Sequence, residues 1–105
     1  MPPSFDKKSI ENAYKILGKK WCVIILCDMA NGKKRFTDFL ESNPALSARV
    51  LALRFKEMQL KKLVRKKFNS KRASHDYVLT PLGVHATVVL TQLIVFSRIH
   101  SNQTN

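Results

Sequence analysis

The sequence predicts a single, mainly α-helical domain with one small β hairpin, an α+β fold, over residues 1–105. Three observations support this fold class. Apolar residues recur at helical spacing in four segments before residue 60, two short β-prone runs follow around a polar turn, and a long apolar segment lies after Thr80. Hydrophobic residues make up 45% of the chain and Gly and Pro are few, which is typical of a globular domain.

The first thirty residues predict two helices. The first carries an apolar stripe at i, i+4 and i+7, and Gly18 is expected to end it; the stripe is Ile10, Tyr14 and Leu17. The second helix is expected over about residues 20–30, ending at Asn31-Gly32. Its inward-facing side chains are predicted to be Trp21, Ile24, Ile25 and Met29.

Two more helices are expected on either side of Asn43-Pro44, because the residue before a proline is pushed out of the α region. The third helix is short, with Thr37 as its expected cap. Its predicted core residues are Phe36, Phe39 and Leu40. The fourth helix begins after Ser47, a favourable N-cap, and runs to about Gln59. Its apolar stripe is Leu51, Phe55 and Met58.

The β-prone runs lie at about residues 63–68 and 75–79, joined by the basic turn 69–74. The last helix is predicted over about residues 81–100, with Thr80 as N-cap and Pro81 in its first turn. Its apolar run, residues 82–96, is shorter than the roughly 20 residues that span a bilayer. We therefore expect a buried helix and no membrane anchor.

This order of elements is that of a winged helix-turn-helix, with the helix-turn-helix at about residues 36–59 and the wing at about 62–79. The charge distribution agrees with such a fold. Thirteen of the 19 Lys and Arg lie between Lys33 and Arg72 against three acidic residues, so this segment carries +10 of the formal charge of +12. The fourth helix would fit the major groove of B-DNA, and double-stranded DNA is the expected partner.

Arg49, near the start of that helix, is the predicted reader of guanine, because a guanidinium can donate to both O6 and N7. Two roles are compatible with the position of Arg54: a contact with DNA, or an ion pair with Glu57 or Asp38. The other cations are expected to bind phosphates. The complete predicted DNA-binding set is Lys33, Lys34, Arg35, Ser47, Ala48, Arg49, Ala52, Leu53, Arg54, Lys56, Arg65, Lys66, Lys67, Lys71 and Arg72.

The last helix is apolar on nearly every side, and such a helix must be covered on every side. In so short a chain a second copy is the simplest cover, so this helix predicts a homodimer. A ligand pocket between this helix and the body is the alternative. The residues of this helix predicted at the dimer interface are Val88, Val89, Gln92, Leu93, Phe96 and Ile99.

No motif for catalysis, metal binding or a cofactor is recognised, and no enzymatic activity is expected. Cys22 and Cys27 lie about 140° apart around a helix, which favours inert buried thiols over a disulfide or a shared metal. A redox role of Cys22 is the alternative. Two cysteines and no signal-peptide pattern predict a cytoplasmic protein.

From Ile16 to Gly83 the chain resembles the HxlR-type regulators of the MarR-like winged-helix group. The resemblance rests on five stretches: Gly18-Lys19-Lys20-Trp21; Gly32 with 35–40; Leu46-Ser47, Leu51 and 54–58; Leu63-Val64-Arg65; and 77–83. It implies a homodimer on operator DNA, with the first and last helices at the interface. This adds Ile10, Tyr14 and Leu17 of the first helix to the predicted dimer interface. Many members carry a sensing cysteine about twelve residues before the Trp. Ser9 stands there, so a thiol switch at that site is not expected.

The expected function is a sequence-specific transcriptional regulator. One alternative is an architectural protein that binds DNA through phosphates alone, and another is a winged-helix protein-interaction module. A small-molecule effector is compatible with the sequence but no residue points to one. RNA binding is less favoured, because Phe68 and Tyr77 are expected to be core strand residues rather than an exposed stacking platform.

Overall fold

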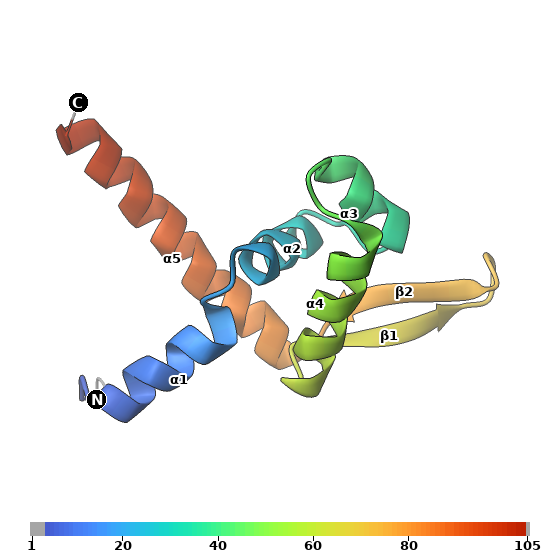
Figure 1. Ribbon diagram of the computed structural model, residues 1–105, viewed down its shortest axis with the longest axis horizontal. Helices are drawn as coiled ribbons and strands as arrows, with labels where there is room; N and C mark the ends of the chain where they lie inside the picture. Colours follow the sequence, from blue (N-terminus) through green and yellow to red (C-terminus); the bar gives the residue numbers. More distant parts are fainter. Residues whose placement is uncertain (1–3, 105) are drawn as a thin grey trace.

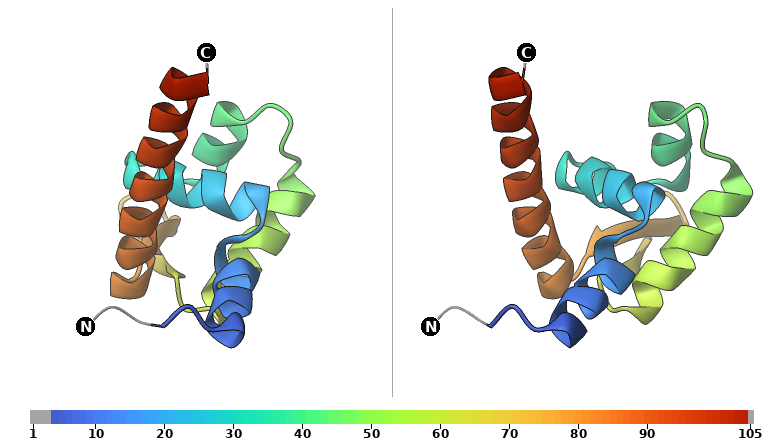
Figure 2. Two further views of the ribbon diagram at one scale, coloured as in Figure 1. Left: turned by 90° about the vertical axis from the view of Figure 1, so that its left-hand side faces the viewer. Right: turned by 60° about the vertical axis from the view of Figure 1, so that its left-hand side comes forward.

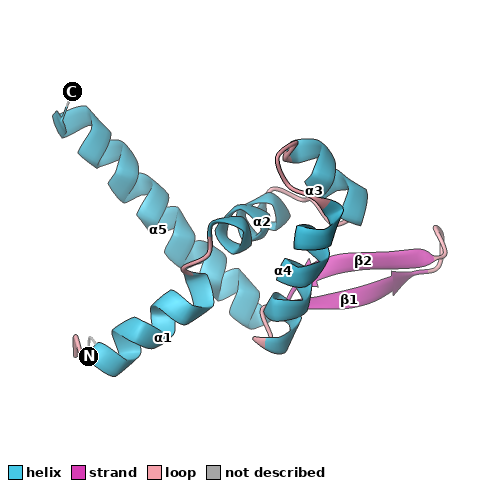
Figure 3. Cartoon of the chain, viewed as in Figure 1, coloured by secondary structure: helices cyan, strands magenta, loops and turns pink. Residues whose placement is uncertain are grey.

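The computed structural model describes residues 4–104, which form five helices and a two-stranded antiparallel sheet (Figures 1 and 3). The elements in chain order are α1 (Lys7–Leu17), α2 (Lys20–Ala30), α3 (Phe36–Ser42), α4 (Ala48–Leu60), β1 (Val64–Asn69), β2 (Ser74–Leu79) and α5 (Pro81–Thr104). This confirms the predicted fold class and element order. Helix α5 continues past residue 100, the end predicted for it.

Two of the three predicted helix caps are present. The hydroxyl of Ser47 accepts a hydrogen bond from an N–H in the first turn of α4 at 3.1 Å, and the hydroxyl of Thr80 does the same for α5 at 3.0 Å. The predicted Thr37 cap is wrong, because α3 begins at Phe36 and Thr37 lies inside the helix. The carboxylate of Asp38 reaches back instead and accepts from the N–H of Arg35 at 3.0 Å.

The core lies between α2, α3, α4, the base of the hairpin and the first turns of α5. Ile25 and Met29 of α2 are buried, as predicted, and Trp21 is half-buried against the core. The prediction for Ile24 is wrong, because it is only half-buried and lies outside the core cluster. Cys22 is buried, as expected for an inert thiol, and Leu26 is the buried residue of α2 that the sequence analysis did not name. Because α2 is apolar on most sides, its periodicity did not identify one inner face.

Aromatic rings join α3, α4 and the sheet. Phe39 of α3 meets Phe55 of α4 edge to face, with ring centroids 5.0 Å apart. Tyr77 of β2 stacks on the same Phe55 ring at 3.7 Å and 11° between the planes. Phe55 therefore holds both the helix-turn-helix and the wing.

The hairpin pairs Val64 with Leu79 at its base and Asn69 with Ser74 at its turn. Beyond the ladder, the N–H of Tyr77 donates to the carbonyl of Lys34 at 2.8 Å, which holds the α2–α3 connection against β2. The basic residues of that connection are thereby placed beside the wing.

Helices α1 and α5 stand away from the body and diverge from each other (Figures 1 and 2). Helix α1 has no buried residue, and α5 buries only Gly83, Ala86 and Leu90 among its described residues. The expectation of a buried last helix is therefore wrong for the single chain, because α5 extends beyond the part of the domain that could cover it. By length and composition alone, α5 is long and apolar enough to cross a membrane.

A carboxylate on α4 ties this helix to the α1–α2 junction. Glu57 accepts hydrogen bonds from the Lys19 ammonium and from the Arg54 guanidinium, each at 3.0 Å. The hydrogen bond from Lys19, with Arg54 nearby, holds the pKa of Glu57 below its ordinary value. Nearby, the Lys61 ammonium donates to the carbonyl of Lys15 in α1 at 2.6 Å. The position of α4 is thus coupled to that of α1.

Gly83 allows α5 to pass directly against the base of the hairpin. A β-carbon at this position would lie 2.0 Å from the carbonyl oxygen of Leu63. In an exposed helix, Gly→Ala stabilises by about 1 kcal/mol. Here we expect Gly83→Ala to destabilise by about 1–3 kcal/mol, because backbone must shift to admit the methyl group. Urea denaturation measures the change, with Val84→Ala on the exposed side of the same turn as control. A more stable Gly83→Ala variant would contradict this packing.

The ion pairs of Glu57 give the protein an acid-sensitive contribution to stability. Because the pKa of Glu57 is lower folded than unfolded, its carboxylate stabilises the fold above the unfolded value of about 4.3, and this contribution is lost as the pH falls through the folded value. The urea midpoint of wild-type protein should therefore be lower at about pH 3.5 than at about pH 7, and this difference should be smaller in Glu57→Gln. Glu41→Gln, at an exposed carboxylate without an ion pair in residues 4–104, should leave the difference unchanged.

Candidate nucleic-acid interface

Helix α4 has one buried side and one exposed side. Leu51, Phe55 and Met58 are almost fully buried and hold the helix to the core. The opposite side, with its N-terminal turn, carries six of the predicted DNA-binding residues, all exposed: Ser47, Ala48, Arg49, Ala52, Leu53 and Lys56. Leu53 is 47% exposed, which is unusual for a leucine on a basic helix. This side is free to enter a groove.

The turn before α4 is held by one amide. The side-chain nitrogen of Asn43 donates to the Asp28 carboxylate at 2.8 Å and to the carbonyl of Phe39 at 2.7 Å. Leu46, just before the N-cap, is buried in the core. These contacts fix how the N-terminus of α4, with Arg49 in its first turn, projects from the body.

Of the roles predicted for Arg54, the structure shows the ion pair with Glu57. Its guanidinium lies against Glu57, and its side chain is only 24% exposed. Asp38, the other partner considered, caps α3 instead. Arg54 therefore serves first as a brace on α4, and its predicted contact with DNA stays a prediction.

Three cations precede α3, and all are exposed: Lys33, Lys34 and Arg35. A hollow of about 410 Å³ is lined by Lys34 of this connection and by wing residues that include Lys67, Lys71 and the acidic residue Asp76, which is paired with Arg72. Positive groups from two elements therefore face one concave surface. Such a surface suits an anion such as a DNA phosphate.

Four of the five cations predicted to bind DNA from the wing are exposed: Arg65, Lys66, Lys67 and Lys71. Arg72, the fifth predicted, behaves differently. It forms an ion pair with the buried carboxylate of Asp76 and donates to the hydroxyl of Ser74 at 3.1 Å. Asn69 also donates to Asp76, at 3.2 Å. Arg72 thus braces the wing turn, a role that favours structure over the predicted phosphate contact. The sequence signal for it is an acid four residues after the arginine, across the turn.

Helix α4 and the wing lie on one half of the molecule, and α1 and α5 project from the other (Figure 1). The predicted DNA-binding residues are therefore brought together on the half opposite the apolar terminal helices. One residue of the wing does not fit the prediction. Phe68, expected in the core, is 58% exposed. It lies one rung before the last pair of the hairpin, whose outer end extends beyond α4 (Figure 1).

The two thiols are free and poorly suited to redox chemistry. Cys22 is 1% exposed, and burial, with the Glu57 carboxylate nearby, raises the pKa of its thiol. Burial likewise raises the pKa of Cys27, although this residue is half-buried rather than buried as predicted. A raised pKa lowers the thiolate fraction and hence the reactivity. Ser9 lies exposed on α1.

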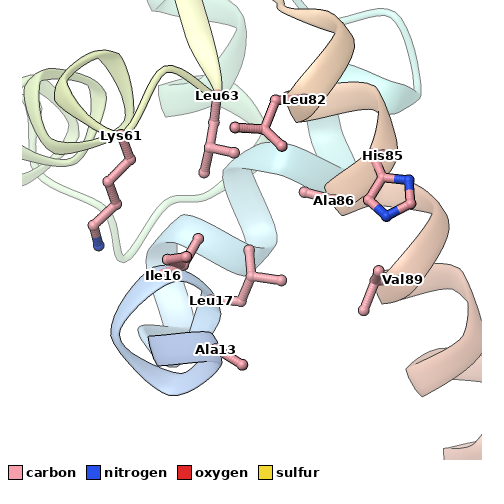
Figure 4. Close-up of a pocket in the computed structure, with 9 residues that line it drawn as sticks. All are labelled: Ala13, Ile16, Leu17, Lys61, Leu63, Leu82, His85, Ala86 and Val89. Carbon is pink, nitrogen blue, oxygen red and sulfur yellow. The ribbon is translucent and has the colours of Figure 1, made fainter. Parts of the chain in front are cut away.

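A second hollow, also of about 410 Å³, lies between α1, the end of α4 and α5 (Figure 4). Its walls are apolar except for the side chains of Lys61 and His85. The lining residues are Ala13, Ile16, Leu17, Lys61, Leu63, Leu82, His85, Ala86 and Val89. It lies where the sequence allowed a ligand pocket between the last helix and the body.

The sequence model of the HxlR-like helix-turn-helix family matches residues 16–105. Two Bacillus subtilis proteins are among the relatives. The HTH-type transcriptional regulator YodB is 34% identical over 85 residues, covering 80% of this chain and 76% of YodB. The uncharacterised HTH-type regulator YvaP is 38% identical over 66 residues, covering 63% of this chain but only 56% of YvaP.

Solved structures share the fold. Reduced YodB superposes with a TM-score of 0.78 at 27% identity, covering 90% of this chain and 92% of YodB. Quinone-bound YodB superposes with a TM-score of 0.74 at 27% identity, covering 87% of this chain and 97% of the YodB chain. A protein from Enterococcus faecalis assigned to the MarR family of transcriptional regulators superposes with a TM-score of 0.83 at 26% identity. The match covers 97% of this chain and 94% of that protein. The chain thus belongs to the HxlR-like helix-turn-helix family, a MarR-like group of transcriptional regulators rather than enzymes.

Proposed function

We propose that this protein is a homodimeric, cytoplasmic regulator that binds a pseudo-palindromic operator in double-stranded DNA. The observation that carries the proposal is the division of α4. Its apolar stripe is locked in the core, while Arg49 and the exposed side project from the half of the molecule that bears the wing. An exposed helix of this kind fits the major groove, and its N-terminal residues reach base edges.

The contacts divide by chemistry. Arg49 reads a guanine, and Ser47 and Ala48 touch phosphate or a thymine methyl beside it. The exposed lysines of the α2–α3 connection, α4 and the wing bind phosphates without reading sequence. Specificity then comes from one short stretch of α4. The +10 charge of the surrounding segment supplies affinity for any duplex.

The terminal helices supply the dimer. Seven of the predicted interface residues are exposed large apolar or aromatic side chains: Ile10, Tyr14, Val88, Val89, Leu93, Phe96 and Ile99. Gln92 is exposed among them, and Leu17 is half-buried against the core. So much apolar surface on two neighbouring helices is typical of an association site. A two-fold dimer formed there would place its α4 helices about 34 Å apart, matching successive major grooves.

Control by a small apolar molecule is the second part of this proposal. The hollow between α1 and α5 favours it, because a ligand there would touch both the dimer helices and the end of α4. One relative, YodB, has been solved with a quinone bound. The buried thiol of Cys22 and the serine at position 9 favour non-covalent binding over a thiol reaction.

Arg49→Ala should weaken binding to a selected operator by about 1–3 kcal/mol and relax the preference at one base pair, because the guanidinium's paired hydrogen bonds to guanine are lost. Lys71→Ala should weaken binding to all duplexes alike, and it should reduce the slope of log K against log salt by about 1. Selection from a random duplex pool, followed by titration of both variants, measures these changes. If Arg49→Ala retains the wild-type base preference, the reading role of Arg49 is excluded.

The wild-type protein provides the reference for both variants. If a dimer neutralises about eight phosphates, log K should fall with a slope near −7 against log salt, a loss of roughly ten-thousandfold between about 50 and about 200 mM. A regulator should also prefer its operator by roughly a thousandfold over random DNA. Equal affinity for all duplexes would favour an architectural role, and no binding at low salt would favour a protein-interaction module.

Leu93→Asp should convert the dimer to monomer, because it buries a carboxylate in an apolar interface. Operator affinity should fall with it, since each monomer then holds one half-site alone. Sedimentation equilibrium measures the assembly state. Leu60→Asp, at an exposed leucine outside the predicted interface, is the matched control and should stay dimeric. A Leu93→Asp protein that remains dimeric would place the interface elsewhere.

A further inference from the structure

Phe68 is an exposed aromatic side chain near the end of a basic wing. It lies on β1 opposite His75 of β2, one rung before the turn. Its ring meets the imidazole edge to face, with centroids 5.5 Å apart, and the side chain is 58% exposed. Between Gly18 and Pro81, the other large apolar side chains so exposed are Leu53 and Leu60 on α4.

The pleat of the hairpin determines the direction in which this ring points. Side chains two residues apart, and those directly paired across the strands, share one face of a sheet. Phe68 and His75 therefore share a face with Lys66 and Tyr77. Tyr77 stacks on Phe55 of α4, so this face is the one against which α4 lies. Phe68 extends the same face beyond the helix, on the side of the proposed DNA contact.

The charges around the ring are positive. Lys66, Lys67 and Lys71 are exposed on the same wing. Asp76, the acidic residue of the hairpin, is buried and paired with Arg72. An apolar ring set among cations complements a polyanion that also presents an apolar surface. The minor groove of DNA is such a partner, since sugars line its walls and phosphates border it.

We propose that Phe68, supported by His75, inserts its ring into the minor groove flanking the operator half-site, where it packs against deoxyribose and the edges of A·T pairs. This inference rests on the proposed function and deepens it. The lysines of the wing bind the phosphates on either side. G·C pairs carry the guanine N2 amino group on the groove floor, and A·T pairs do not, so the ring packs closely only over A·T flanks. Phe68 thus adds a preference that α4 does not read.

The test uses full-length protein and three duplexes with the same selected core and A·T, G·C or inosine·C flanks. Inosine·C pairs lack the N2 amino group, so their minor groove resembles that of A·T. Wild-type protein should bind the A·T and inosine·C duplexes about tenfold more tightly than the G·C duplex. Phe68→Ala should bind all three duplexes with the affinity that wild-type protein has for the G·C duplex. The preference of Phe68→Leu for A·T flanks should lie between those of wild type and Phe68→Ala.

Leu60→Ala removes an exposed apolar side chain from the end of α4 outside the proposed contact, and it should behave as wild type. Thermal melting of each variant checks the fold, which should persist because the Phe68 side chain is more than half exposed and lies near the end of the hairpin. If Phe68→Ala binds each of the three duplexes as tightly as wild-type protein does, the proposal is overturned, and the result would point to a protein partner for the ring. An equal loss on all three would also overturn it, by showing no groove-specific contact. If wild-type protein binds no duplex, the proposed function fails before this inference is reached.

Discussion

The stack of Tyr77 on Phe55 is the contact on which the rest of this structure depends. Phe55 belongs to α4, and it meets Phe39 of α3 edge to face while Tyr77 of β2 covers its other side. One buried ring therefore sets the position of α4 relative to both its partner helix and the wing. Because β strands alternate their side chains, the same stack also determines which wing residues lie on the α4 side.

Charge and apolar surface are separated along the chain and in space. The basic segment forms the half with α4 and the wing, and the apolar segment forms α5 on the other half. A chain of 105 residues has too little body to cover a 24-residue apolar helix from all sides. The surface that the fold leaves open is thus a consequence of its size, and it favours association with another chain.

Three acidic residues of the basic half have internal roles. Asp38 caps α3, Glu57 holds Arg54 and Lys19, and Asp76 holds Arg72 inside the wing. Two of the arginines are therefore neutralised by the fold, and the exposed lysines carry most of the remaining positive charge. Net charge alone overstates the number of cations that can meet DNA, and the ion pairs identify those that cannot move freely toward it.

The sequence by itself determined the order of elements, the start of α4 at Ser47 and the start of α5 at Thr80. These depend on local signals, since a hydroxyl cap and a proline act within one turn of their own position. Helix propensity and periodicity also separated the buried stripe of α4 from its exposed side. The identification of Arg49 as an exposed residue of α4 followed from the same periodicity, and its role in reading DNA stays a prediction.

The tertiary structure decided what depends on distant neighbours. Alternation could place Phe68 on the core face of β1, but only the tertiary structure showed that α4 crosses the hairpin near its base and that Phe68 is exposed (Figure 1). Periodicity could not choose the inner face of α2, because apolar residues surround that helix and its neighbours select one side. Arg72 is paired rather than free because the hairpin brings Asp76 across the turn. In each case burial and charge pairing arise from contacts between segments, which a linear pattern does not specify.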